Sequence, residues 1–95
     1  MAIRYCGRVK INCAYRDRSN DYRCTFSIDG KNRGTVHVGV PGTLQHAVDS
    51  MAAYDDTTHA AIAFAIDDGI IDGSDLDFTT SGYHIRKTEK YPHVP

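Results

Sequence analysis

The sequence predicts a small α+β domain in which one main helix covers one face of an antiparallel sheet, in the order β-β-β-α-β. Three stretches before residue 42 alternate between apolar and polar side chains, which is the period of a strand with one buried face. A later stretch, residues 51–68, has apolar side chains at spacings of three and four, which is the period of a helix. A chain of 95 residues can bury one modest core, so residues 1–88 are predicted to form a single domain.

The first three strands are predicted to form an antiparallel meander. They span residues 3–15, 22–28 and 34–40, with turns at 17–20 and 29–32. In the first strand the odd-numbered residues are predicted to face the core. The even-numbered residues then point outward, and Cys6 among them is a surface thiol.

The register of the first hairpin follows from the same alternation. If Arg16 pairs with Asp21, every inward residue of the first strand meets an inward residue of the second. Cys13 and Cys24 are then neighbours across the strands. Three cysteines without a CxxC pair favour a reducing, cytosolic setting, in which two packed free thiols are expected instead of a disulfide.

The main helix has two candidate start signals. Thr43 follows Pro-Gly and caps a short first turn at 44–48, whereas Ser50 is the stronger N-cap of the main helix at 51–68. Gly69 suits the left-handed position just past the helix end. The predicted buried stripe comprises Tyr54, Thr58, Ala61, Phe64 and Ala65, widened by Ile62 and Ile66.

Two aspartates end this helix, where the helix dipole is negative. Asp67 and Asp68 should each cost up to about 1 kcal/mol there. Either a tertiary partner compensates them, or the helix end frays and both carboxylates are solvated.

The last strand is predicted at residues 82–88, beside the first strand, which gives the spatial order 4-1-2-3 through a right-handed crossover. Tyr83 and Ile85 then face inward, and His84 and Arg86 face outward. Residues 89–95 contain two prolines and are predicted to be a loose tail.

The net charge of −1 conceals a strongly polarised chain. Residues 1–41 carry eight Lys or Arg against three Asp, a segment charge of +5. Residues 42–78 carry eight Asp and neither Lys nor Arg, a segment charge of −8. Residues 79–95 return +2. This layout points either to a charged partner or to complementary charge between the sheet and helix layers.

The outward face of the sheet is therefore expected to be basic, and the helix with its exit loop acidic. The basic set is Arg4, Arg8, Lys10, Arg16, Arg23, Arg33, His37, His84 and Arg86. The residues predicted to contact a partner are Arg4, Arg8, Lys10, Arg23, Arg33, Asp55, Asp56, Asp67 and Asp68. A basic sheet also suits nucleic acid, but readers of single strands stack bases on outward aromatics, and here the strand aromatics are expected to face inward.

No pattern predicts catalysis, a metal or a cofactor. Five histidines are scattered without ligand spacing, and the acidic stretch 67–77 lacks oxygen donors at the positions a calcium loop requires. No Gly-rich phosphate loop and no nucleophile context is present. No apolar run approaches a membrane span, and the N-terminal residues contain no apolar signal region, so we expect a cytoplasmic protein.

The size, the meander with its helix, and the segment AVDSMAAYDDTTHAAIAFA resemble small accessory proteins of phages and mobile elements of the anti-CRISPR or other anti-defence kind. The resemblance implies a non-enzymatic inhibitor that covers a surface of a host defence complex. The alternatives are a small nucleic-acid-binding module using the basic sheet face, and a structural protein that dimerises through the edge strand at 34–40.

Overall fold

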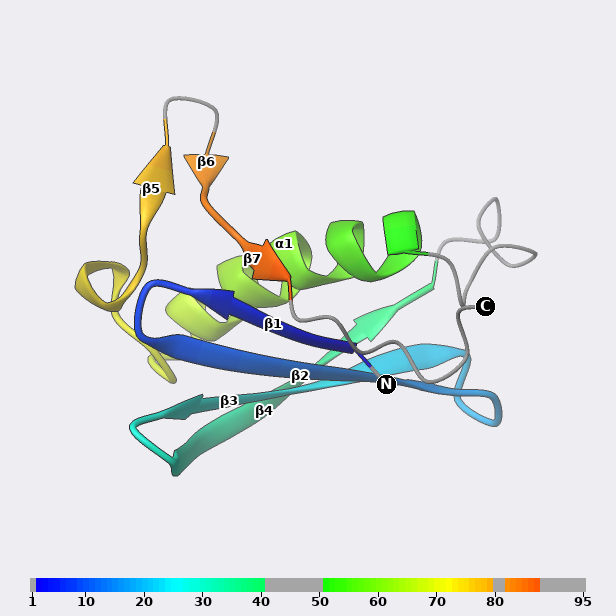
Figure 1. Cartoon of the computed structure of the whole chain (residues 1–95). Coiled ribbons are helices and arrows are strands. Elements are labelled where there is room, and N and C mark those ends of the chain that lie inside the picture. Colours follow the sequence, from blue (N-terminus) through cyan, green and yellow to red (C-terminus); the bar gives the residue numbers. More distant parts are fainter. Residues whose placement is uncertain (1, 41–50, 80–81, 88–95) are drawn as a thin grey trace.

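The computed structural model describes residues 2–40, 51–79 and 82–87. Helix α1 (Met51–Asp67) lies across one face of a five-stranded sheet of order β4-β3-β2-β1-β7 (Figure 1). The sheet strands are β1 (Ala2–Cys6), β2 (Val9–Arg16), β3 (Asp21–Ile28), β4 (Lys31–Gly39) and β7 (Arg86–Lys87). A 3-10 turn, η2 (Gly73–Asp75), and a separate hairpin of β5 (Phe78–Thr79) and β6 (Gly82–Tyr83) connect α1 to β7. The α+β class is confirmed, but four strands precede the helix instead of three.

The extra strand arises at Gly7, where the predicted first strand is divided into β1 and β2. Gly7 and Arg8 form a two-residue turn between the paired residues Cys6 and Val9. Gly7 has φ 59° and Arg8 does not have a positive φ, which is the pattern of a type II′ hairpin turn. The prediction of one strand over 3–15 was wrong because periodicity does not distinguish a tight two-residue turn from a continuing strand.

This turn reverses the facing of β1. The two turn residues shift the pairing so that Ala2, Arg4 and Cys6 are buried with Val9, while Ile3 and Tyr5 are only half-buried. The predicted outward positions of Arg4 and Cys6 are therefore wrong. Cys6 is a buried thiol whose Sγ lies 3.5 Å from the carbonyl oxygen of Asp77, and burial raises its pKa.

The register predicted for the hairpin around residues 17–20, which joins β2 and β3, is confirmed. Arg16 pairs with Asp21, and Cys13 pairs with Cys24 as buried free thiols. The Sγ of Cys13 also lies 3.6 Å from the Oγ1 of Thr58 on α1. A hydrogen bond with Cys13 and burial both raise the pKa of the Cys24 thiol, so Cys24 stays protonated in the core.

The helix packs as predicted, with one exception. Tyr54, Thr58, Ala61, Ile62 and Ala65 are buried against the sheet, whereas Phe64 is 45 % exposed. Phe64 therefore lies at the border of the buried stripe.

The helix ends in a Schellman motif at Gly69, which has φ 74°. Gly69 N–H donates to the carbonyl of Ile66 at 3.1 Å, and Ile70 N–H donates to that of Ala65 at 2.9 Å. Asp67 and Asp68 are exposed and form no ion pair in the described part of the chain, so the solvated interpretation of both carboxylates holds there.

The predicted last strand corresponds to β6 and β7, which are separated by His84 and Ile85. β7 pairs antiparallel with β1, so its place beside the first strand is confirmed. Tyr83 and Ile85 pack against the core and His84 is exposed, as predicted. The caps at Thr43 and Ser50, the turn at 44–48 and the tail at 89–95 lie outside the described residues.

Candidate interaction surfaces

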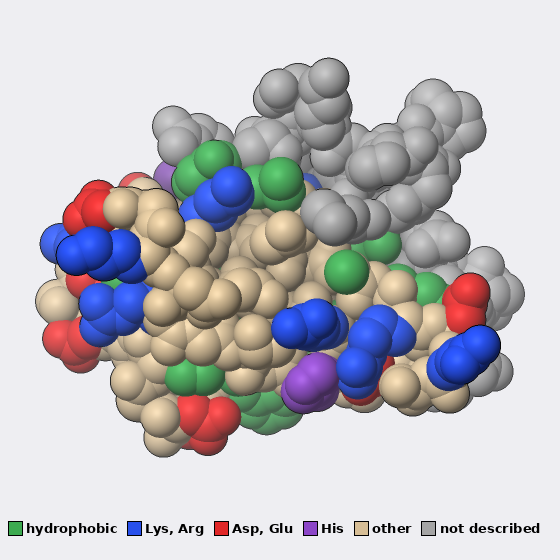
Figure 2. All heavy atoms as spheres, turned by 90° about the horizontal axis from the view of Figure 1, so that it is seen from below, with side chains coloured by type: hydrophobic (Ala, Val, Ile, Leu, Met, Phe, Trp, Pro, Cys, Tyr) green, Lys and Arg blue, Asp and Glu red, His purple; other side chains and the backbone are tan. Residues whose placement is uncertain are grey.

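The open face of the sheet is the face that α1 does not cover. The described side chains on this face are Ile3, Tyr5, Lys10, Asn12, Ala14, Arg16, Asp21, Arg23, Thr25, Ser27, Thr35 and His37. Figure 2 shows this face with Lys and Arg toward its two ends and mostly uncharged groups in the middle. Thr25 and Thr35 lie in this middle part, with their hydroxyl oxygens 3.3 Å apart. The face is thus less basic than the sequence predicts.

Arg4 and Asp55 account for part of the difference, because they form an internal ion pair. Arg4 is fully buried, and its Nε donates to the Oδ1 of Asp55 on α1 at 3.0 Å. Its Nη2 lies 3.0 Å from the same oxygen as an ion pair. The Asp55 side chain is 30 % exposed. Both were predicted to contact a partner. That prediction is wrong for Arg4, because its facing in β1 is reversed and its charge serves to join sheet and helix.

Arg8 forms ion pairs with two loop carboxylates, and its side chain remains exposed. Its Nη2 lies 3.1 Å from the Oδ2 of Asp29, and its Nε lies 3.6 Å from the Oδ1 of Asp75. Arg8 N–H also donates to the carbonyl of Asp75 at 3.2 Å, which joins the β1–β2 turn to η2. The Arg8 and Asp29 side chains are 57 % and 75 % exposed, so this pair contributes little to stability.

Lys10 and Arg23 are the predicted residues that the structure does place on the open face. Both are exposed, and neither forms an ion pair within the described ranges. Arg33 is also exposed but lies on edge strand β4. On the helix side, Asp56, Asp67 and Asp68 are exposed as predicted.

Arg16 and Asp21 form a bidentate pair at one end of the open face. Nε and Nη2 of Arg16 donate to the two Asp21 carboxylate oxygens at 2.8 and 2.7 Å. These hydrogen bonds lower the pKa of Asp21 and raise that of Arg16. His37 Nδ1 lies 3.7 Å from the same carboxylate and 3.0 Å from Arg16 Nη2.

The pKa shift of Asp21 predicts a pH-dependent contribution to stability. Because the folded-state pKa is below the unfolded value of about 3.9, the contribution is complete above that value and is lost as pH falls through the folded-state pKa. We expect the unfolding free energy of wild type minus Asp21→Asn to be constant between about pH 5 and 7 and to shrink below about pH 4. Urea unfolding at several pH values measures this difference.

Asp17→Asn is the matched control, because Asp17 is an exposed turn aspartate without an ion pair in the described chain. Its difference from wild type should stay flat over the same range. Equal pH profiles for the two variants would rule out the Arg16–Asp21 pair as the cause.

The exposed side of α1 carries a second candidate surface, which the sequence did not predict. His59 stacks on Tyr83 of the β5–β6 hairpin with ring centroids 6.3 Å apart, and Tyr83 contacts Phe78 at 5.1 Å. Phe78 is 57 % exposed. We call His59, Tyr83 and Phe78 the aromatic cluster.

Acidic and small residues extend this cluster along the helix. At 100° per residue, His59 and Phe64 lie about 140° apart around α1. Between them fall the exposed side chains Asp56, Ala63 and Asp67 and the half-buried Ala60. We call this strip together with the aromatic cluster the helix face. It bears the two large hydrophobic side chains that are exposed in the described part of the chain, Phe64 and Phe78.

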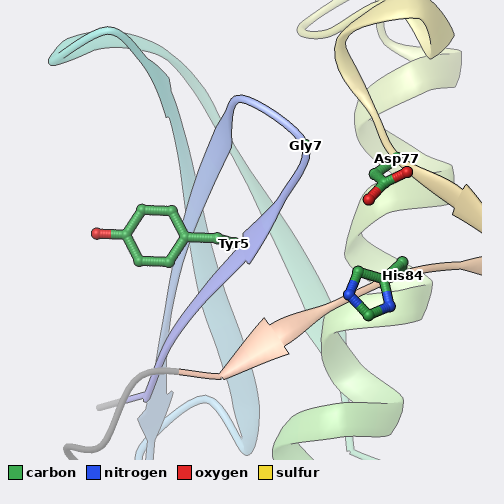
Figure 3. Close-up of a pocket in the computed structure, with 4 residues that line it drawn as sticks. All are labelled: Tyr5, Gly7, Asp77 and His84. Atoms are coloured by element: carbon green, nitrogen blue, oxygen red, sulfur yellow. The ribbon is translucent and has the colours of Figure 1, made fainter.

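A shallow pocket lies between the turn of β1–β2 and the segment around β5 and β6. Its volume is about 220 Å³, and Tyr5, Gly7, Asp77 and His84 line it. Figure 3 shows the Asp77 and His84 side chains on the same side, whereas the Tyr5 ring points away from them. Asp77 and His84 are linked by a backbone hydrogen bond of 2.8 Å from His84 N–H to the Asp77 carbonyl. Among the lining residues that the structure describes there is no Ser, Cys or Lys that could act as a nucleophile beside this carboxylate and imidazole.

The described residues also show no gathering of three His, Cys, Asp or Glu side chains that would hold a metal ion. Within residues 2–40, 51–79 and 82–87, no helix has the length and apolar character that crossing a membrane requires.

Two residues of these surfaces had a signal that the prediction did not use. Phe78 is the one aromatic residue in a mostly polar segment, DLDFTTSG, that shows neither a helix nor a strand period. Tyr5 lies outward because Gly-Arg at 7–8 is a turn, and Gly followed by another residue is a known two-residue hairpin signal. A 13-residue strand would also have been more than twice the usual length of about 5–6 residues.

No protein-family model matches this sequence, and no curated protein or solved structure matches it either.

Proposed function

We propose that the protein is a non-enzymatic inhibitor that acts in the host cytoplasm by binding a host defence protein complex of the CRISPR-Cas kind through its helix face. The observation that supports this proposal is the exposure of Phe64 and Phe78 on the acidic side of the molecule. The partner class rests on the resemblance to anti-defence proteins of phages.

The composition of the helix face suits a protein contact. Aromatic side chains are enriched at the centres of protein–protein interfaces, where they supply most of the binding energy. Asp56 and Asp67 lie between the aromatic groups, and residues 42–78 contain neither Lys nor Arg. A basic protein surface with an apolar centre complements this arrangement, and the complementary charge speeds association.

Expression of the protein in bacteria that carry single, defined defence systems tests the proposal. We expect it to restore plaque formation by a targeted phage in at least one strain. The double variant Phe64→Ser/Phe78→Ser should no longer restore plaque formation. It should bind the purified defence complex at least about thirtyfold more weakly, since an interface hot spot contributes 2 kcal/mol or more. Biolayer interferometry measures the affinity.

Lys10→Ser/Arg23→Ser is the matched control, because it removes two exposed side chains from the opposite face. This control variant should restore plaque formation as well as the wild-type protein does. Both double variants change exposed residues, so each should fold. Two outcomes would contradict the proposal. In one, the phenylalanine variant still restores plaque formation. In the other, the wild-type protein restores it in no strain.

One observation favours nucleic-acid binding as the second candidate function. Tyr5 lies on the open face directly across from Lys10, and Arg23 is exposed on the same face. An outward aromatic beside cations is the arrangement that binds unpaired bases. In that case Lys10→Ser/Arg23→Ser weakens binding to single-stranded oligonucleotides and reduces its salt dependence, while the phenylalanine variant binds normally.

A further inference from the structure

We propose that the free edge of strand β4 binds an extended acidic segment of a partner protein, which adds to the sheet as a sixth strand. This surface is separate from the helix face, and the inference does not depend on the function proposed above.

One hydrogen bond shows which residues of β4 direct their backbone N–H and C=O groups toward the free edge. Val40 donates its N–H to the carbonyl of Asn20 at 3.2 Å, which continues the β3–β4 ladder. Bonding alternates along an antiparallel pair, so every second residue of β4 directs its N–H and C=O away from β3. The outward-directed residues are Thr35, His37 and Gly39. No backbone hydrogen bond of the described residues uses these groups on the edge side.

A bulge confines the open edge to these residues. Gly34 pairs with Phe26 and Asn32 pairs with Ser27, so Arg33 is an extra residue on β4. Bulges commonly protect sheet edges from pairing. Packing favours glycine next to this bulge, because a Cβ at Gly34 would lie 3.0–3.2 Å from three atoms of Ile70. Beyond it the register is regular as far as Gly39, which leaves a length of edge for a short strand.

The side chains around this edge are mostly basic, which favours an acidic partner strand. The exposed charged or titratable side chains of β4 are Lys31, Arg33 and His37, and Arg23 of β3 pairs directly with His37. Asp21 is the one carboxylate that the described parts of β3 and β4 carry within their strand bounds, and Arg16 already bonds both of its oxygens. A strand with Asp or Glu at alternate positions would place its carboxylates near Arg23, Arg33 and Lys31.

A second copy of β4 does not supply the acidic side chains that this edge favours. It would bring another Lys31 and Arg33 to the edge and no acidic side chain, and like charges across paired strands are unfavourable. The edge therefore fits a foreign acidic strand better than its own copy. Main-chain hydrogen bonds would supply affinity, and the alternating carboxylates would supply specificity.

A peptide of ten residues that alternates Asp and Val tests the proposal by NMR titration of the protein amides. One control peptide has the same composition in two blocks, five Asp and then five Val. The other replaces each Asp by Lys. We expect the alternating acidic peptide to bind at least about tenfold more tightly than either control. Its binding should slow hydrogen exchange at the Thr35, His37 and Gly39 amides, while the Val36 and Val38 amides are already protected in the free protein.

Two substitutions at one position separate the backbone from the side chain. His37→Pro removes an N–H that points to solvent and leaves the ladder to β3 intact. It should weaken peptide binding at least about tenfold. His37→Ala keeps the N–H and should weaken binding less than about threefold. If His37→Pro does not fold, Thr35→Pro removes the neighbouring outward N–H, and the exchange measurement on the wild-type protein needs no substitution.

Equal binding of the alternating and block peptides would overturn the proposal, because it would show charge attraction without strand pairing. So would unchanged binding by His37→Pro, or a wild-type exchange pattern that lacks protection at the outward amides in the complex. A dimer that is lost in His37→Pro, together with no peptide binding, would replace the foreign strand by a second copy of this chain.

Discussion

Asp55→Ala is expected to destabilise the protein by about 3 kcal/mol, because it removes the carboxylate that pairs with the fully buried Arg4. Removing one partner of a buried ion pair typically costs 3–5 kcal/mol. The lower end applies here, because the Asp55 side chain is 30 % exposed and water can reach part of the site. Urea unfolding of the variant and wild type at pH 7 gives the difference in unfolding free energy.

The neighbouring residue supplies a control in the same helix turn. Asp56 is exposed and forms no ion pair in the described chain, so Asp56→Ala should stay within about 0.5 kcal/mol of wild type. Arg4→Met should destabilise less than Asp55→Ala, since it removes the buried charge instead of leaving it without its carboxylate. Equal effects of Asp55→Ala and Asp56→Ala would show that the Arg4 pair contributes nothing.

Gly7→Ala is expected to destabilise the protein by about 3 kcal/mol for two separate reasons. Gly7 has φ 59°, a conformation that costs an L-residue roughly 1–2 kcal/mol. The added Cβ would also lie 2.5 Å from the carbonyl oxygen of Asp75 and 2.9 Å from the carbonyl carbon of Leu76. Because both contacts are with backbone, the turn would have to move away from η2, which breaks the contacts of Arg8 with Asp75.

Gly30→Ala separates the two causes. Gly30 has φ 78° in the β3–β4 turn, but a Cβ there meets nothing within 4 Å. It should therefore show only the conformational cost, about 1 kcal/mol. The excess destabilisation of Gly7→Ala over Gly30→Ala measures the packing of the turn on residues 75–77. Equal losses in thermal or urea unfolding would refute this packing contribution.

The buried Arg4–Asp55 pair shows that part of the charge polarisation along the sequence serves contacts within the protein. The sequence layout left open whether opposite charges serve a partner or join the sheet to the helix. Arg4–Asp55 and Arg8–Asp75 are contacts of the second kind, since each links the basic N-terminal segment to the acidic one. Lys10, Arg23 and Arg33 on one side and Asp56, Asp67 and Asp68 on the other remain exposed for contacts with a partner.

The periodicity of apolar residues along the sequence predicted much of the fold. Alternation in β2 and β3 predicted the register down to Cys13 opposite Cys24, because a shift of one residue would move every apolar side chain out of the core. The 3.6-residue period with Gly69 predicted α1 and its end, since only glycine enters the left-handed conformation at low cost.

The features that local pattern missed depend on contacts between distant residues. The turn at Gly7 is held by η2, about 70 residues later in the chain, and it is this turn that brings Arg4 inward and Tyr5 outward. Phe64 is exposed although it lies in the helical period, and Phe78 is exposed in a hairpin that is separate from the main sheet. Periodicity specifies which residues share a face of one element, but whether that face is covered depends on where the other elements pack.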